Sequence, residues 1–136
     1  AEIRRHARCS LSGMDHDTII SEQVIGCAIE VHRDLGPGLL ESPYHTALCV
    51  ELAHRGIAFE RGRAIPLEYH GIRIGDYIPD LIVENTVVVE IKSVLRFEDV
   101  FTAQMLTYLR LTGLRVGLII NFNKRLLREG LKRVVF

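Results

Sequence analysis

The spacing of hydrophobic positions changes along the chain, and each spacing predicts a different kind of secondary structure. Apolar residues recur every three or four positions over residues 17–35 and again over about 40–55, which predicts two helices. The glycine–proline–glycine run at 36–38 separates them, because neither residue type continues a helix. Ser42 and Pro43 give the second helix an alternative start, with Ser42 as the N-cap.

After the second helix the pattern becomes extended. The predicted elements are strands at 57–60 and 64–69, an extended run at 72–83, a strand at 86–92, a helix at 97–111, and strands at 115–121 and 131–136. His70-Gly71 is expected to form a turn, Gly75 to interrupt the extended run with a bend or bulge, and Gly113 to end the helix. Two helices, a strand meander, a helix and a strand predict an α/β or α+β sandwich.

Residues 1–13 have no clear periodicity, whereas Met14 would make a natural start. We therefore predict a disordered upstream extension or cloning remnant at 1–13 and a single domain over 14–136. A chain of 136 residues with 48% hydrophobic and 25% charged residues can bury one sizeable core but not two. No apolar run approaches the ~20 residues of a membrane span and no signal peptide is visible, which predicts a soluble, cytoplasmic protein without a membrane partner.

The charge balance limits the kind of nucleic-acid partner. With 17 basic and 17 acidic side chains, the formal net charge is zero, which argues against a general DNA coat. Near the C-terminus five basic residues stand against Glu129 alone: Lys124, Arg125, Arg128, Lys132 and Arg133. A solvated face explains such a cluster, and a nucleic-acid contact is the alternative. Three scattered cysteines fit neither a zinc site, a disulfide framework nor an iron–sulfur cluster.

Two acids and one lysine are the candidate chemistry. Side chains alternate along a strand, so Glu90 and Lys92 point to the same face. A three-residue loop that pairs Val83 with Val87 would place Asp80 opposite Glu90 on that face. Facing carboxylates repel unless a cation such as Mg²⁺ or Mn²⁺ compensates, and Lys92 would then assist a water or offset phosphate charge. The alternative is an exposed hairpin whose Asp, Glu and Lys form a salt-bridge ladder.

The surrounding residues resemble a known family. Pro79-Asp80 followed by Glu90-Ile91-Lys92 at the end of an apolar strand resembles the PD-(D/E)xK nuclease signature. Gly38-Leu-Leu-Glu41-Ser-Pro-Tyr44 resembles the motif of the GxxExxY proteins, a branch of that superfamily. The similarity runs from about Ser21 to the C-terminus through His32-Arg-Asp-Leu-Gly-Pro-Gly, Leu106-Thr-Tyr108-Leu and Gly117-Leu-Ile-Ile-Asn121-Phe-Asn123.

The resemblance implies a restriction-endonuclease-like core, a central mixed sheet flanked by helices, with a metal site at one sheet end. It implies that Asp80, Glu90 and the Ile91 carbonyl bind Mg²⁺ or Mn²⁺, that Glu41 completes the site, and that Lys92 assists the water. Glu41 has an alternative role, because an acid at a helix N-terminus also favours the helix dipole.

Further positions match RecB-like nucleases of the superfamily. Gln104 and Tyr108 are similar to a Q-x-x-x-Y element and share one helical face, where they are expected to contact substrate or hold the lysine. For Tyr108 the alternative is a packing role. His32 matches the place of a metal-binding histidine, and the alternative is an interaction with the helix C-terminal dipole. Ile78 departs from the pattern, because an arginine is expected there.

These observations predict a metal-dependent nuclease, or nuclease-like phosphodiesterase, that hydrolyses DNA or RNA through Mg²⁺-activated water. The alternative is a catalytically silent module that keeps the nuclease fold for binding or assembly, in line with the neutral charge and Ile78. A third hypothesis is hydrolysis of a small phosphate ester. Because many nucleases of this class pair, the resemblance also makes a homodimer an expectation for this chain.

Overall fold

A computed structural model describes residues 15–136; the predicted extension at 1–13 and Cys9 lie outside the described residues. The elements, in chain order, are α2 (His16–Leu35), α3 (Glu41–His54), β1 (Phe59–Arg61), β2 (Ile65–Tyr69), β3 (Ile72–Tyr77), β4 (Leu81–Val83), β5 (Val87–Lys92), α4 (Asp99–Thr112), β6 (Val116–Asn121), the 3-10 helix η1 (Leu127–Gly130) and β7 (Leu131–Val135). Apart from the run at 72–83, the predicted elements match these bounds to within about two residues. No helix of residues 15–136 combines the length and apolar character needed to cross a membrane.

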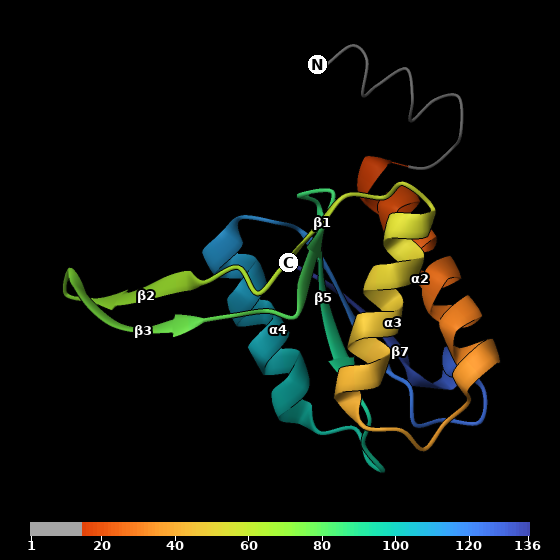
Figure 1. The fold of residues 1–136 in the computed structure, drawn as a ribbon. Coiled ribbons are helices and arrows are strands. Elements are labelled where there is room, and N and C mark those ends of the chain that lie inside the picture. Colours follow the sequence, from red (N-terminus) through yellow and green to blue (C-terminus); the bar gives the residue numbers. More distant parts are fainter. Residues whose placement is uncertain (1–14) are drawn as a thin grey trace.

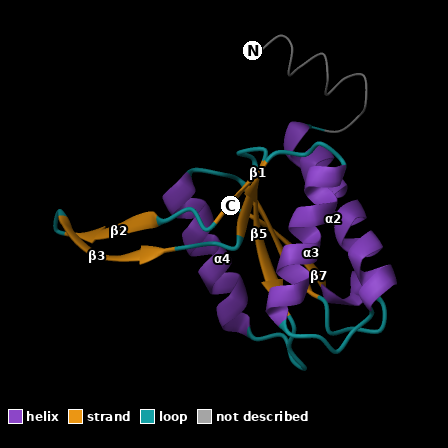
Figure 2. Ribbon diagram, in the orientation of Figure 1, coloured by secondary structure: helices purple, strands orange, loops and turns teal. Residues whose placement is uncertain are grey.

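Five strands form a mixed sheet in the order β1-β4-β5-β6-β7, in which only β5 and β6 pair in parallel. A parallel pair needs a crossover connection, and α4 supplies it. Helices α2 and α3 cover one face of the sheet and α4 covers the other (Figures 1 and 2). This arrangement confirms the predicted central mixed sheet flanked by helices.

Strand alternation divides the interior into two cores. On β5, Val87, Val89 and Ile91 pack in the cluster formed with α2 and α3, whereas Val88 packs with Ile82 in the cluster under α4. Both faces of β5 are therefore apolar over most of its length, as expected for a central strand covered by helices on both sides. Polar side chains can reach the surface only where the strand ends.

The extended run predicted at 72–83 consists of two strands, β3 and β4, which belong to different sheets. Strand β3 pairs with β2 in a separate two-stranded sheet, whereas β4 joins the main sheet. The break falls at Ile78–Asp80, where Pro79 has no N–H to donate to a ladder. The interruption expected near Gly75 is confirmed as a bulge, because Gly75 pairs with Leu67 and the next pairing skips Ile74. Figure 1 shows the β2–β3 hairpin projecting from the body.

The start of α3 also differs from one prediction. The helix begins at Glu41 with Leu40 as its N-cap, so Ser42 is not the cap. Pro43 lies within the first turn, where a missing N–H loses no helical hydrogen bond. Tyr44 holds the loop before α3 in place. Its side chain is fully buried, and its hydroxyl donates to the Gly36 carbonyl at 2.5 Å and accepts from the Leu39 N–H at 3.1 Å.

We expect Tyr44→Phe to lower the free energy of unfolding by about 1–2 kcal/mol, because it leaves two main-chain groups of the 36–40 loop without their partner. Urea unfolding followed by circular dichroism measures the loss. The matched control is Tyr69→Phe, since Tyr69 is 64% exposed on the projecting hairpin. Equal stability of the two variants would contradict a structural role for the Tyr44 hydroxyl.

Candidate active site

The β4–β5 hairpin sets the register of the site. Val83 pairs with Val87 across a three-residue loop, which confirms the predicted pairing. Two loop residues adopt left-handed φ angles, 52° at Glu84 and 49° at Asn85. Asparagine tolerates this conformation better than most residues. Because the loop has three residues, the polar ends of the two strands face each other rather than being offset by one position.

The two acids lie opposite each other at the open end of this hairpin. The Asp80 N–H donates to Glu90 Oε1 at 2.8 Å, and the Ile91 N–H donates to Asp80 Oδ2 at 2.8 Å. Each carboxylate thus uses one oxygen on the main chain of the neighbouring strand and keeps the other for a further partner. Among residues 15–136, no Lys, Arg or His side chain forms an ion pair with either acid.

Burial and the neighbouring acid strongly perturb Glu90. Glu90 is 7% exposed. Burial first, and then the charge of Asp80, raise the pKa of Glu90 to about 8, although the Asp80 N–H and Lys92 act in the opposite direction. Without a nearby cation, Glu90 is therefore mostly protonated at neutral pH. The site favours the ionised form of Glu90 only when additional positive charge is present.

Lys92 borders an open pocket beside the acids. It lies two residues after Glu90 on β5, so both side chains point to the α4 face of the sheet. Its Nζ lies 4.4 Å from the centroid of the Phe101 ring. The pocket has a volume of about 510 Å³ and is lined by Tyr77, Lys92, Val100, Phe101, Ala103, Gln104 and Thr107. The fold thus brings Gln104 and Lys92, predicted to act together, to one pocket.

The strand end that carries Lys92 is held by the next strand. The buried side chain of Asn121 accepts from the Val94 N–H at 3.1 Å and donates to the Val94 carbonyl at 3.0 Å. The Phe122 N–H donates to the Lys92 carbonyl at 2.9 Å. Ser93 donates through its hydroxyl to the Leu39 carbonyl, next to the start of α3. These bonds fix the direction in which the chain leaves the site.

Glu41 and Tyr108 lie near the acids from opposite helices. Glu41 is exposed at the start of α3, and its charge makes the smallest of the named contributions to the pKa of Glu90. Tyr108 is 4% exposed on α4 and meets Tyr77 edge-on at 5.8 Å. Burial, followed by the charges of Glu90 and Asp80, raises the pKa of Tyr108, so its hydroxyl stays protonated.

His32 has its contacts elsewhere. Its Nε2 lies 2.7 Å from the Lys124 carbonyl oxygen, and its ring is tilted against Phe122 with the centroids 6.4 Å apart. Because a carbonyl only accepts, the Nε2 carries the proton in this contact. The bond ties the end of α2 to the segment after β6. Neither contact involves an acid, so the structure does not bring His32 together with Asp80 and Glu90.

His45 was missed by the sequence reasoning. It lies one turn after Glu41 on α3, and its Nε2 is buried without a hydrogen-bond partner among residues 15–136. Burial lowers the pKa of His45 against the opposing effect of the Asp80 charge, so the imidazole is neutral at pH 7. The four-residue spacing from Glu41, which places both side chains on one helix face, was the available signal.

The donors at this site suit a hard divalent cation. In the described part of the chain, no three His, Cys, Asp or Glu side chains converge into a preformed metal site. Mg²⁺ does not require one, because proteins commonly hold it through one or two carboxylates while it keeps several waters. The second oxygens of Asp80 and Glu90 could bind such an ion. The Ile91 carbonyl could also bind it, because in an extended strand it points to the same edge as the Ile91 N–H, which faces Asp80.

The fold and the paired acids agree with a comparison against known families. The model of the PD-(D/E)XK nuclease superfamily matches residues 18–134. The chain belongs to the PD-(D/E)XK nuclease superfamily. This match runs from α2 into β7 and confirms the predicted restriction-endonuclease-like core. PD-(D/E)XK nucleases generally use divalent metals. No curated protein and no solved structure was found to match the chain.

We expect the metal-free protein to lose stability as the pH rises from about 4.5 to about 8, by an amount on the order of a few kcal/mol. The sign follows because folded Glu90 holds its proton to a higher pH than the unfolded chain does. Glu90→Gln should remove this loss and so be more stable than the wild type at pH 8.5, with the difference shrinking toward pH 5. Urea unfolding at pH 5, 7 and 8.5 in EDTA measures the free energy of unfolding of the wild type and of Glu90→Gln.

The matched control is Glu22→Gln, an exposed acid on α2, which should keep the wild-type pH dependence. Parallel profiles for the wild type and Glu90→Gln would show that Glu90 ionises in the folded protein without penalty.

Proposed function

We propose that this chain is a divalent-metal-dependent nuclease that hydrolyses phosphodiester bonds of DNA or RNA. The observation that carries the proposal is the pair of facing acids at the open end of the β4–β5 hairpin, where Glu90 has a pKa of about 8. Such a pair lacks positive charge, and a divalent cation supplies it. Membership of the PD-(D/E)XK nuclease superfamily supports the same activity.

Asp80, Glu90 and the Ile91 carbonyl would hold Mg²⁺ or Mn²⁺. Bound there, the ion lowers the pKa of a coordinated water and offsets charge on the phosphate. Glu41 would extend the set from the start of α3, because its charge is near enough to raise the pKa of Glu90. The unpartnered Nε2 of His45 supports this arrangement, because a buried polar atom without a partner is a position that a bound water would satisfy.

Lys92 and α4 would act on the substrate from the other side. The Lys92 ammonium group orients the attacking water or stabilises negative charge that develops on the phosphate. Gln104 lines the same pocket and can donate and accept hydrogen bonds through its amide. Tyr108 packs edge-on against Tyr77 near the acids and would have a structural role there. We assign His32 a structural role, because its ring is engaged with the Lys124 carbonyl.

We further infer that the chain is of the GxxExxY type with RecB-like features. The GxxExxY-like motif spans the start of α3, where Tyr44 fixes the preceding loop and Glu41 lies near Glu90. The Q-x-x-x-Y element lies on α4, where Gln104 lines the pocket that Lys92 borders and Tyr108 lies near the two acids. The two motifs therefore approach one site from opposite faces of the sheet.

A catalytically silent binding or assembly module is the second candidate. Both carboxylates already accept main-chain hydrogen bonds, which would hold them in place without a metal. Ile78, 53% exposed, stands where the resemblance leads one to expect an arginine. A self-paired homodimer would suit either candidate. Measured metal binding separates the two.

We expect Lys92→Ala to lower the rate of nucleic-acid cleavage roughly 10²- to 10³-fold while Mn²⁺ binding persists, because the lysine stabilises charge rather than holding the ion. Asp80→Asn should lose both nucleic-acid cleavage and Mn²⁺ binding. Cleavage of single-stranded DNA, duplex DNA and RNA with Mg²⁺ or Mn²⁺ tests the first statement, and titration calorimetry with Mn²⁺ tests the second. Arg110→Ala is the control, since Arg110 is exposed in the last turn of α4.

If the wild type and Lys92→Ala leave all three substrates equally intact, the proposed catalysis is wrong. Mn²⁺ binding that Asp80→Asn does not reduce would instead favour the silent module.

A further inference from the structure

The chain has only three lysines, and two cation–ring contacts, one ring pair and one shared pocket link them in a row. Lys92 Nζ lies 4.4 Å from the centroid of the Phe101 ring, and that ring meets Phe97 edge-on with centroids 5.4 Å apart. On the other side of Phe97, Lys132 Nζ lies 5.2 Å from the ring centroid. Lys132 and Lys124 then line a single pocket. We call these five residues the lysine–phenylalanine track.

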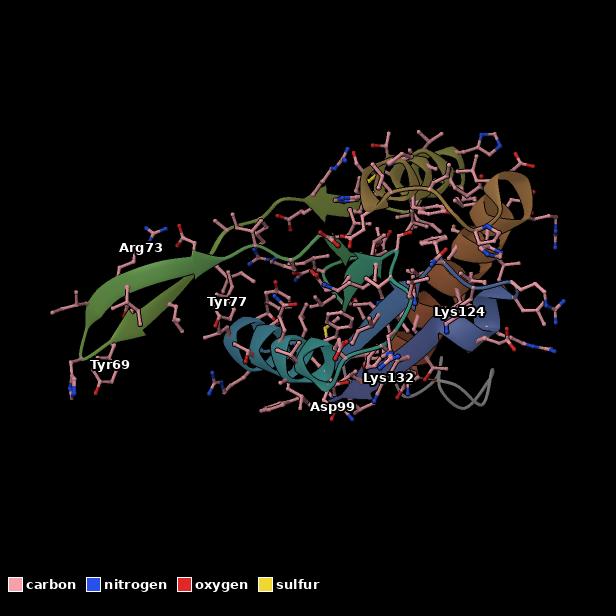
Figure 3. The ribbon with its side chains drawn as sticks, turned by 90° about the horizontal axis from the view of Figure 1, so that it is seen from below. Tyr69, Arg73, Tyr77, Asp99, Lys124 and Lys132 are labelled. Carbon is pink, nitrogen blue, oxygen red and sulfur yellow. The ribbon has the colours of Figure 1, made fainter. Side chains whose placement is uncertain are left out.

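The track lies where β5 ends and where α4 and β7 begin, beside the loop that follows β6. Phe97 and Phe101 flank the start of α4, and Lys92 ends β5. Lys132 lies on β7 opposite Ile119, whose side chain packs in the cluster under α4. Figure 3 looks onto this side from below and labels Asp99 at the start of α4, Lys132 on β7 and Lys124. The active-site lysine and the basic segment near the C-terminus are thus joined across one surface.

The track is positively charged and partly aromatic. Lys124 and Lys132 form no ion pair with any carboxylate of residues 15–136. Their shared pocket, of about 180 Å³, holds one acid, Glu129, against the two lysines. Both phenylalanine rings are half-buried, so part of each is open to a ligand. Alternating cations and aromatic rings are the surface chemistry that binds phosphates and stacks bases.

We propose that a single strand of nucleic acid lies along the lysine–phenylalanine track, with bases stacked on Phe101 and Phe97 and phosphates paired with Lys132 and Lys124. The inference deepens the proposed function and rests on it, because it names the substrate class of that same site. Unpaired bases present their faces for stacking on protein rings, whereas the bases of a duplex are already stacked on one another and must be separated before a ring can enter. The lysines that now cover the rings have flexible stems and would move to the phosphates as the bases stack.

Fluorescence anisotropy with the full chain in EDTA tests binding apart from cleavage. The probes are fluorescein-labelled single-stranded DNA, RNA of the same sequence, and the DNA duplex. Lys132→Gln should weaken single-strand binding roughly 3- to 10-fold. It should also make the slope of log K against log salt concentration shallower by about 0.7, the contribution of one phosphate contact. Its control is Arg133→Gln, which removes the same charge from the opposite face of β7, where Arg133 reaches Thr18.

Phe97→Leu tests the stacking. It keeps an apolar side chain in the rim of the α4 core, and should weaken single-strand binding roughly 5-fold while leaving duplex binding unchanged. Its control is Phe136→Leu, an aromatic residue 62% exposed at the other end of the sheet, where its N–H meets the Arg115 carbonyl. Both control variants should stay within about twofold of the wild type.

The outcomes separate the track from the nuclease activity. Equal effects of Lys132→Gln and Arg133→Gln, or of Phe97→Leu and Phe136→Leu, would overturn the track, as would a duplex that binds as tightly as the single strand. Those results would leave cleavage, measured separately with metal, untouched. Strand binding that depends on Lys132 and Phe97 in a protein that cleaves nothing would support the track and reject the nuclease. The RNA arm decides which sugar the surface prefers.

Discussion

The facing carboxylates of Asp80 and Glu90 are the constraint around which the rest of the site is arranged. Because Glu90 is buried and faces the Asp80 charge, its ionised form is disfavoured unless positive charge lies nearby. The main chain holds each acid by one oxygen, so neither can swing away to relieve the repulsion. A proton on Glu90 is one solution, and a divalent cation is the other. The chemistry proposed here uses the second.

Several features of the fold hold Asp80 and Glu90 in these positions. The three-residue loop fixes the register of β4 against β5, and the helices on both faces bury the rest of β5. Asn121 binds the chain just beyond Lys92, while Tyr44 binds the loop before α3. Residues that touch no substrate thus determine where the candidate catalytic groups lie, which is how preorganised sites are generally supported.

A neutral chain can still present a positive surface to a nucleic acid. The lysines of the lysine–phenylalanine track gather at the side of the fold where β5 ends, although lysine and arginine together only balance the acids overall. Charge placed in this way would guide a strand toward the acids without the general affinity of a DNA-coating protein. The net charge of the chain therefore does not indicate where positive side chains gather on its surface.

Local physical rules allowed the sequence by itself to determine which two strands carry the facing acids. Side-chain alternation and the length of one loop place Asp80 opposite Glu90, and both depend only on neighbouring residues. The sheet flanked by helices could be predicted in the same way, from periodicity and from the resemblance to the superfamily.

Only the tertiary structure determined the contacts between residues that are far apart in the sequence. The run at 72–83 divides between two sheets because strand partners are chosen by long-range pairing, which periodicity does not encode. His45 approaches Asp80, and Phe97 meets Lys132, only because α3 and α4 pack on opposite faces of the sheet. Contacts between segments distant in sequence depend on how those helices pack, and no local pattern carries that information.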